Sequence, residues 1–296
     1  MKVGFFGTPQ IAADVLKELF SEFSIEFLVT SPDKPKGRSK KLIPSEAKQI
    51  ALEKNIPLYQ PTTLKDEKLI ETLKQHTADI FVVVAYGKII PRNIFDLPRL
   101  QTINMHPSLL PLYRGAAPVQ WALINGEIES GVTVQLINEE LDAGDILLQE
   151  KFPINENATS KEIFQLAIPL GITLLKKAIY GLNKNTISPL KQNDSSATYC
   201  GKIDKEIALI NWQWDARKIH NLVRGCNPKP VAWTSFREKN IKIWETSLFN
   251  EPLSLSPGEI FRFQKKHLLI GTGNVIIKLH SLQPEDKKER NEISFF

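Results

Sequence analysis

The stretch Ile80-Phe81-Val82-Val83-Val84-Ala85 is apolar throughout and decides the fold class of the first half of the chain. A strand that is covered on both faces has this composition, which is typical of parallel sheets flanked by helices. Other apolar runs occur at 3–6, 25–29 and 102–105, and helical patterns at 11–20, 45–54 and 66–75 separate them. Strands that alternate with helices in this way predict an α/β domain with a mostly parallel sheet.

The sheet is expected to continue through 131–138 and 145–152 and to be followed by an amphipathic helix over 160–180. Residues 183–203 are polar, rich in turn formers and without a clear period, so we interpret them as a linker. A helical pattern near 215–224 and five short strand candidates follow, which predicts a small OB-like β-barrel. The expected organisation is a first domain over 1–182, a linker over 183–203 and a barrel over 204–296.

Composition and charge narrow the class of protein. Of the 296 residues, 42% are apolar and 24% are charged, which excludes a disordered chain and an integral membrane protein. The net charge of +5 is unevenly distributed, at −1 over residues 1–182 and +6 over residues 183–296. Such an excess indicates a polyanion partner for the second part, although an ordinary protein surface can also carry it.

The cysteine count and the apolar segments indicate the compartment. Cys200 and Cys226 are the only cysteines and form no CxxC spacing, so neither a disulfide framework nor a cysteine zinc site is expected. The apolar run after Met1 is too short for a signal peptide, and we expect no later stretch to span a membrane. We therefore expect a cytoplasmic protein.

The turn after the first strand argues against a nucleotide cofactor. Gly4 and Gly7 are followed by Thr8, Pro9 and Gln10, so the GxGxxG pattern that holds a dinucleotide pyrophosphate is absent. A nicotinamide or flavin dehydrogenase is disfavoured.

The densest cluster of polar residues lies where a predicted strand ends. Its sequence is Asn104-Met105-His106-Pro107-Ser108-Leu109-Leu110-Pro111. Ligands of open α/β sheets bind outside the carboxyl ends of strands. Asn104 and His106 are two residues apart and point the same way on an extended backbone. The alternative is that Asn104 begins a turn and His106 is a satisfied buried ring. A carboxylate from Leu141-Asp142-Ala143-Gly144-Asp145 could favour a protonated histidine, and the spacing does not decide between Asp142 and Asp145.

These motifs resemble those of the 10-formyltetrahydrofolate-dependent formyltransferases. The resemblance rests on residues 104–111, 113–118, 131–133 and 141–145. Further segments narrow it to the family members that formylate methionyl initiator tRNA, namely residues 6–9, 32–42, 85–87, 199–205, 227–230 and 282–284. It implies a Rossmann-like formyltransferase domain followed by an OB-like barrel that binds tRNA. It also implies that 10-formyltetrahydrofolate is a consumed cosubstrate and that no metal is required. Nothing in the sequence requires an oligomer, so we expect a monomer.

The resemblance also assigns roles to residues of this sequence. It implies that Asn104, His106 and Asp142 are the catalytic trio and that the segment Ser108, Leu109, Leu110 and Pro111 contacts the folate. The chemistry suits these residue types. A free α-amine titrates at ~7.7–8.0 and needs no strong base, so the barrier lies in the oxyanionic tetrahedral intermediate, which an amide and a protonated imidazole can stabilise.

Five of the eight residues from Lys34 to Lys41 are basic. Such a run is ordinarily a solvated face. In the family that the sequence resembles, this loop contacts the tRNA acceptor stem, which implies that Arg38, Lys40 and Lys41 bind tRNA. Arg38 is suited to selective contacts because its planar fork forms paired hydrogen bonds, whereas a lysine supplies a point charge.

Three rival functions remain at this point. A formyltransferase with a purine or nucleotide-sugar acceptor would share the trio, and a 10-formyltetrahydrofolate hydrolase would use water in place of the amine. A non-catalytic RNA-binding protein would not need Asn104, His106 and Asp142 together.

Overall fold

The computed structural model describes residues 1–35, 42–249, 251–264, 266–285 and 287–291. The chain divides into two compact units, each of which is described by itself. The N-unit comprises Met1–Ala116, Gly131–Lys151 and Leu166–Tyr199, and the C-unit comprises Ala117–Ser130, Phe152–Gln165 and Cys200–Phe296. Two segments that we expected in the first domain, 117–130 and 152–165, therefore group with the C-unit.

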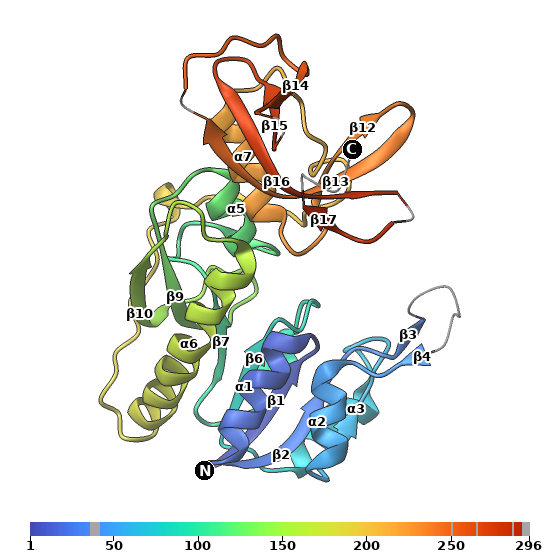
Figure 1. Ribbon diagram of the computed structural model, residues 1–296. Helices are drawn as coiled ribbons and strands as arrows, with labels where there is room; N and C mark the ends of the chain where they lie inside the picture. The colour runs from blue at the N-terminus through green and yellow to red at the C-terminus, as the bar shows by residue number, and fades with distance from the viewer. Residues whose placement is uncertain (36–41, 250, 265, 286, 292–296) are drawn as a thin grey trace. The chain divides into compact units, whose positions relative to one another are not determined.

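The N-unit contains a seven-stranded sheet in the order β10-β9-β7-β6-β1-β2-β5 (Figure 1). Neighbours from β7 to β5 are parallel, and β9 is antiparallel to β7. The mostly parallel α/β sheet expected from the sequence is confirmed. Its strands are β1 (Lys2–Gly7), β2 (Ser24–Val29), β5 (Leu58–Tyr59), β6 (Ile80–Val84), β7 (Thr102–His106), β9 (Glu129–Leu136) and β10 (Ile146–Pro153).

The expected helices of the N-unit form with small shifts at their ends. They are α1 (Gln10–Phe20), α2 (Glu46–Glu53), α3 (Glu67–Gln75) and α6 (Ser160–Asn183), of which residues 160–165 group with the C-unit. The single turn α4 (Arg92–Phe95) was not expected from the sequence. Ser45 caps α2 by accepting from Lys48 N, and Asp66 caps α3 by accepting from Lys68 N. These caps satisfy backbone donors that a helix start leaves free, so both starts fall close to their predicted residues.

Aromatic side chains fill one face of the sheet. The ring of Phe81 lies 5.3 Å from that of Phe27 and 5.4 Å from that of Phe6, measured between centroids. A Cβ at Gly4 would lie 2.3 Å from the ring of Phe27. The glycine in the first strand therefore makes room for the rings, and α3 and α4 pack over them through Leu73 and other buried side chains.

The C-unit contains an antiparallel sheet in the order β12-β13-β16-β15-β14, with β17 paired to β16. Of the expected OB-like barrel, the small β domain is confirmed, and its sheet is antiparallel. Strand β13 is longer than expected because its first half pairs with β12, over 239–243, and most of its length pairs with β16, over 241–249. The strands are β12 (Ala232–Phe236), β13 (Lys239–Phe249), β14 (Ile260–Phe263), β15 (His267–Gly271), β16 (Ile276–Pro284) and β17 (Arg290–Asn291). Within the described residues, the end strands β12 and β14 do not pair with each other.

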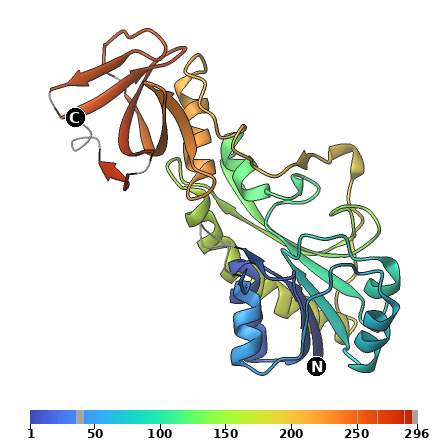
Figure 2. The ribbon, with the colours of Figure 1, turned by 90° about the vertical axis from the view of Figure 1, so that its right-hand side faces the viewer.

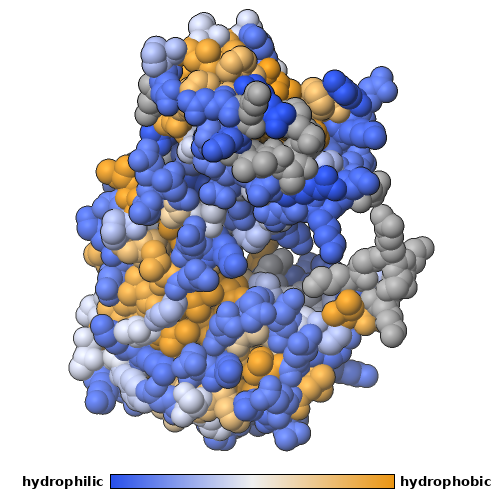
Figure 3. All heavy atoms as spheres, in the orientation of Figure 1, coloured by the Kyte–Doolittle hydropathy of each residue, from blue (hydrophilic) through white to orange (hydrophobic). Residues whose placement is uncertain are grey.

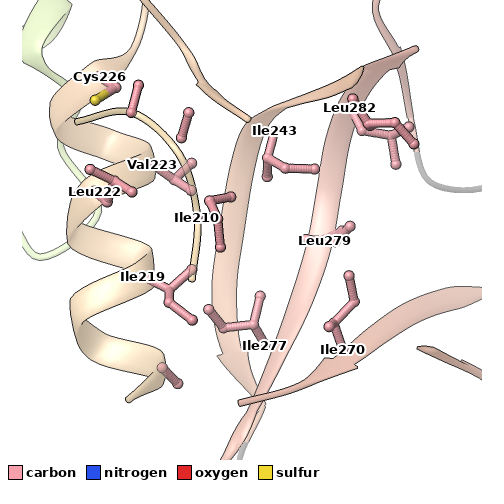
Figure 4. Packing of buried hydrophobic residues seen from close by; sticks show 14 of the residues in the cluster. Ile210, Ile219, Leu222, Val223, Cys226, Ile243, Ile270, Ile277, Leu279 and Leu282 are labelled. Carbon is pink, nitrogen blue, oxygen red and sulfur yellow. The ribbon is translucent and has the colours of Figure 1, made fainter. Parts of the chain in front are cut away.

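Helix α7 (Ala216–Cys226) packs its apolar face on this sheet. Figure 4 shows Ile219 and Val223 on the side of the helix that faces Ile243 and Ile277 of the strands. Burial raises the pKa of the Cys226 thiol at the end of α7 to about 12, so this cysteine is an inert core residue at neutral pH.

A short helix that the sequence interpretation did not predict, α5 (Pro118–Ile124), lies beside α7 (Figures 1 and 2). A Cβ at Gly225 would lie 2.7 Å from Ile124 Cγ1, so the glycine permits the close approach of the two helices. The helix has only seven residues, and its one start signal is a proline at its first turn.

Helix α6 is long and apolar enough to cross a membrane by length and composition alone, contrary to our expectation of no such stretch. Apolar side chains gather in the region of α6 on the face that Figure 3 shows. Six of its residues nevertheless belong to the buried core, namely Ile163, Ala167, Leu174, Leu175, Ala178 and Ile179. The helix also carries the Lys176–Glu22 ion pair, at 2.7 Å. We therefore interpret α6 as a core helix.

The segment interpreted as a linker contains packed structure. It includes the 3-10 turn η1 (Asp194–Ser196) and β11 (Tyr199–Cys200), which pairs with β8 (Arg114–Gly115). Arg114 N donates to Thr198 O at 2.8 Å, and the Gln192 side chain is buried. Residues up to Tyr199 thus pack in the N-unit rather than forming a free connection.

Replacing Ile277 tests the core of the C-unit. Ile277 is fully buried, so Ile277→Ala should lower the free energy of unfolding by about 2–5 kcal/mol, through lost burial and a residual cavity. Denaturant unfolding followed by tryptophan fluorescence measures this, because all five tryptophans belong to the C-unit. Ile128→Ala is the control, since Ile128 is 82% exposed and should change stability by less than about 0.5 kcal/mol. Equal effects of the two substitutions would contradict the assigned core.

Candidate active site

Strand β7 carries Asn104 and His106 to the carboxyl end of the sheet. The strand lies between β6 and β9, where Asn104 is opposite Val83 and Gln135 and His106 is opposite Thr133. Asn104 is partly buried and His106 is buried. Neighbouring strands therefore fix the backbone of Asn104 on both sides and that of His106 on the β9 side, and the two side chains project from the same face of β7.

Asp142 reaches this point from the loop between β9 and β10. Its φ of 51° lies in the left-handed region, which Asp adopts more readily than most residues do. A Cβ at Gly144 would lie 1.9 Å from Leu136 O, so only glycine fits there. Leu136 N also donates to Asp145 O at 2.9 Å, which ties the two ends of the loop together.

The Asp142 carboxylate brings the three predicted catalytic residues together. Its Oδ1 accepts from Asn104 Nδ2 at 3.4 Å and from Gln135 Nε2 at 3.2 Å. Its Oδ2 accepts from Gly115 N at 2.8 Å and lies 3.6 Å from His106 Nδ1. The choice between Asp142 and Asp145, which the sequence spacing left open, is settled by these contacts in favour of Asp142 as the carboxylate beside His106.

The surroundings of His106 assign its hydrogen atoms. His106 Nε2 lies 2.8 Å from Tyr113 O, and a carbonyl oxygen can only accept, so Nε2 carries a hydrogen. The distance from Nδ1 to Asp142 Oδ2, 3.6 Å, is an ion-pair distance and too long for a hydrogen bond. Nδ1 therefore has no close hydrogen-bond partner in the described part of the chain and faces the same space as the Asn104 amide.

The segment Ser108–Pro111 is fixed by hydrogen bonds inside the N-unit. Thr133 Oγ1 donates to Ser108 O at 2.7 Å and accepts from Leu110 N at 3.2 Å. Ser108 Oγ donates to Leu112 O, and the side chains of Ser108 and Leu110 are buried. The partly exposed side chains of this segment that could touch a ligand are those of Leu109 and Pro111.

Three side chains near the site were given no role by the sequence interpretation. Gln135 binds Asp142 directly, and Gln192 binds the Asp142 loop and the buried Arg114. Burial lowers the pKa of the Arg114 guanidinium, but its hydrogen bonds to Asp194 and Tyr199 outweigh this effect and leave the pKa raised. The motif Tyr113-Arg114-Gly115 was the available signal, whereas a glutamine in a polar segment gave none.

The predicted tRNA contacts Arg38, Lys40 and Lys41 lie outside the described residues. The segments on either side, β3 (Lys34–Pro35) and β4 (Leu42–Ile43), form an antiparallel pair. Just before them, Asp33 accepts from Lys48 Nζ at 2.6 Å, and this contact lowers the pKa of the Asp33 carboxyl. The base of the basic loop is thus anchored to α2.

Family models and curated relatives match nearly the whole chain. The formyl transferase model matches residues 1–178, and the formyl transferase C-terminal domain model matches residues 202–296. A methionyl-tRNA formyltransferase from Clostridium novyi is 42% identical over 97% of this chain and 94% of its own length. A methionyl-tRNA formyltransferase from Clostridioides difficile is 38% identical over 97% of this chain and 94% of its own length.

Solved structures share the fold. WlaRD, a sugar 3N-formyl transferase crystallised in the presence of dTDP and 5-N-formyl-THF, matches with a TM-score of 0.69 and 23% identity over 97% of this chain and 99% of its own. HypX from Aquifex aeolicus, in complex with tetrahydrofolic acid, matches with a TM-score of 0.67 and 17% identity over 98% of this chain and 46% of its own.

Thr133→Val tests the hub of the Ser108–Pro111 segment. Valine has nearly the same shape but leaves the buried Ser108 O and Leu110 N without the hydroxyl, so the free energy of unfolding should fall by about 1–3 kcal/mol. Calorimetric unfolding of the intact chain measures the change. Thr173→Val on the exposed side of α6 is the matched control and should leave the melting transition nearly unchanged. An unchanged transition in Thr133→Val would contradict the role of the hydroxyl.

Proposed function

The chain belongs to the methionyl-tRNA formyltransferase family, and we propose that Asn104, His106 and Asp142 transfer the formyl group of 10-formyltetrahydrofolate to the α-amino group of methionyl initiator tRNA. The observation that carries the proposal is the Asp142 carboxylate, which binds the Asn104 amide and lies at ion-pair distance from the His106 ring. The product is N-formylmethionyl-tRNA for translation initiation.

The amine nitrogen attacks the formyl carbon, and the bond from that carbon to the folate nitrogen then breaks. Since the free α-amine titrates at ~7.7–8.0, a useful share is neutral without a base. The attack leaves negative charge on the formyl oxygen. Asn104 Nδ2 donates one hydrogen to Asp142, and its second hydrogen has no protein partner in the described residues, so it can bind that oxygen.

His106 and Asp142 complete the reaction in this proposal. The Nε2 hydrogen is held by Tyr113 O, which leaves Nδ1 as the ring atom that faces the reacting groups. A hydrogen on Nδ1 adds a second donor to the oxyanion. Asp142 Oδ2, 3.6 Å from Nδ1, can take the proton that the amine loses and return it, directly or through water, to the departing folate nitrogen.

The donor set fits a formyl oxygen, and the neighbouring segment fits an apolar ring system. The partly exposed side chains of Leu109 and Pro111 would contact the folate, while Ser108 and Leu110 would act through the backbone that they hold in place. The cosubstrate supplies an already activated formyl group, so no covalent enzyme intermediate is needed.

The C-unit has the character of an RNA-binding surface. Basic side chains lie over aromatic rings at three places, with Lys205 Nζ 4.7 Å from the Trp233 ring and Lys218 Nζ 4.3 Å from the Trp214 ring. The third pair is Arg237 over Phe236. Cations and rings together suit a phosphate backbone and its bases, and residues 200–296, the longest stretch of this unit, hold 16 basic and 11 acidic side chains. We therefore assign tRNA affinity to the C-unit and discrimination to the loop with Arg38, Lys40 and Lys41.

Variants of Asn104 and of two aspartates in one loop, Asp142 and Asp145, test the catalytic assignment. Asn104→Ala should lower the turnover rate by about 10²–10³-fold, since an oxyanion donor is lost, and Asp142→Asn should also lower it strongly. The matched control Asp145→Asn makes the same change three residues away and should retain activity. The assay follows labelled formyl-methionine on charged initiator tRNA with 10-formyltetrahydrofolate. Wild type that releases formate without labelling tRNA would be a hydrolase, and equal rates for Asp142→Asn and Asp145→Asn would refute the role of Asp142.

Arg38→Ala tests the proposed discrimination by the basic loop. The variant should lose turnover on tRNA with the initiator acceptor stem and lose little on a mismatched stem, so the ratio of the two kcat/KM values falls while overall tRNA affinity changes little. Lys68→Ala on α3 removes one charge elsewhere in the N-unit and serves as control. Proportional losses on both stems would show that Arg38 supplies affinity alone.

A further inference from the structure

We propose that Gln192 is a positioning residue that couples the buried Arg114 guanidinium to the Asp142 carboxylate and so sets the geometry of formyl transfer. The inference rests on the proposed function and goes beyond it, because Gln192 belongs to none of the segments to which the sequence gave a role. The Gln192 side chain is 5% exposed, so it acts through other residues rather than by touching substrate.

The partners of Gln192 determine which atom of its amide is which. Its Oε1 faces the Nε and Nη2 atoms of Arg114, at 3.1 and 2.9 Å, and a guanidinium can only donate. Its Nε2 faces Asp142 O at 2.9 Å and Gly144 O at 2.7 Å, and carbonyl oxygens can only accept. The amide is therefore held in one orientation by groups that cannot exchange roles.

The same reasoning extends the chain of hydrogen bonds to the carboxylate. Gln192 Nε2 also lies 3.0 Å from Gln135 Oε1, and since its two hydrogens face three acceptors, one hydrogen is shared between two of these oxygens. The Gln135 amide nitrogen then donates to Asp142 Oδ1 at 3.2 Å. Every donor then points from the cation toward the anion, from Arg114 through Gln192 and Gln135 to Asp142. Aligned hydrogen bonds of this kind strengthen one another in a buried setting.

Arg114 is a firm anchor for this chain. It is 2% exposed, its Nη2 donates to Asp194 Oδ1 at 2.7 Å and its Nη1 donates to Tyr199 OH at 3.4 Å. Arg114 N also pairs with Thr198 O, so both its backbone and its side chain are tied to the segment that carries Gln192. Gln192 transmits this fixed position to the backbone of the Asp142 loop.

The loop needs such support, because Asp142 is in the left-handed region and the carbonyls of Asp142 and Gly144 would otherwise lack these donors. If the loop shifts, Asp142 Oδ2 moves relative to His106 and the Asn104 amide turns with Oδ1. A displacement of about 1 Å at a reacting group can cost about 10²-fold in rate. We therefore expect Gln192 to act on kcat and to leave substrate binding nearly intact.

Gln192→Glu is the decisive variant, because it keeps the shape and the oxygen for Arg114 but has no N–H for Asp142 O and Gly144 O. It should lower kcat by about 10–100-fold, with KM for tRNA and for the folate nearly unchanged. Asn193→Asp is the matched control, since it makes the same chemical change in the next residue, which is exposed and whose side chain bonds to Ser195 and Ser196 of the adjoining turn. Thermal unfolding of both variants is compared with wild type.

A double substitution separates positioning from a general structural role. If Gln192 acts through Asp142, adding Gln192→Glu to Asp142→Asn should change the remaining rate by no more than about twofold. If Gln192 has a merely structural role, the double variant should lose the same factor in rate that Gln192→Glu loses in the wild-type background. Arg114→Lys keeps the charge and loses the fork, so it should show the same loss in kcat, and it decides the matter if Gln192→Glu does not fold.

The outcomes distinguish this inference from the proposed function. A wild-type protein that does not formylate methionyl-tRNA refutes the function itself. If the wild type is active, three results for Gln192→Glu overturn the positioning role and leave the function intact. The first is a rate equal to that of Asn193→Asp, and the second is a loss that appears only in KM. The third is a loss of rate that adds in full to that of Asp142→Asn.

Discussion

The Asp142 carboxylate is the group on which the arrangement of the candidate site depends. Its side chain is only 15% exposed, and a carboxylate withdrawn from water is stable only when donors replace the lost hydration. Gly115 N, Gln135 Nε2 and Asn104 Nδ2 supply those donors. Because these donors come from three separate stretches of chain, the carboxylate holds β7, β9 and β8 in a fixed geometry.

The same constraint explains why this position suits aspartate rather than glutamate. Residue 142 must adopt a φ of 51°, which costs most L residues roughly 1–2 kcal/mol and which the short Asn and Asp side chains tolerate best. It must also place both carboxylate oxygens close to the backbone, since Oδ2 accepts from Gly115 N at 2.8 Å. A longer side chain would add a rotatable bond and carry the charge past these donors.

Sequence reasoning predicted the elements whose pattern is local and missed contacts that are made across the chain. The run Ile80–Ala85 and its neighbours predicted the parallel sheet because strands covered on both faces must be apolar throughout. The spacing of the polar residues left Asp142 and Asp145 open, and only the resemblance to the formyltransferases implied Asn104, His106 and Asp142 as a group. Gln192 was assigned to a linker because polar, turn-rich sequence ordinarily lies in solvent, and its burial depends on Arg114, which is 78 residues away. The local pattern of apolar and polar residues contains no information about a contact between side chains so far apart in the sequence.

The proposed RNA affinity and the proposed catalysis depend on different physical features of the chain, and the sequence reports on the two differently. Salt-dependent RNA affinity depends on the number of cations that meet phosphates, so the +6 of residues 183–296 already carried a signal in composition alone. The proposed catalysis depends on the placement of a few neutral amides and one carboxylate, and the net charge of a segment does not reveal such a placement. The N-terminal part, at −1, hides both the basic Lys34–Lys41 run and the buried Arg114, because acidic side chains elsewhere offset them in the sum. The net charge of a segment can therefore indicate a surface for a polyanion. A site built from oriented hydrogen bonds can be recognised only when the pairing of the strands that carry it is known.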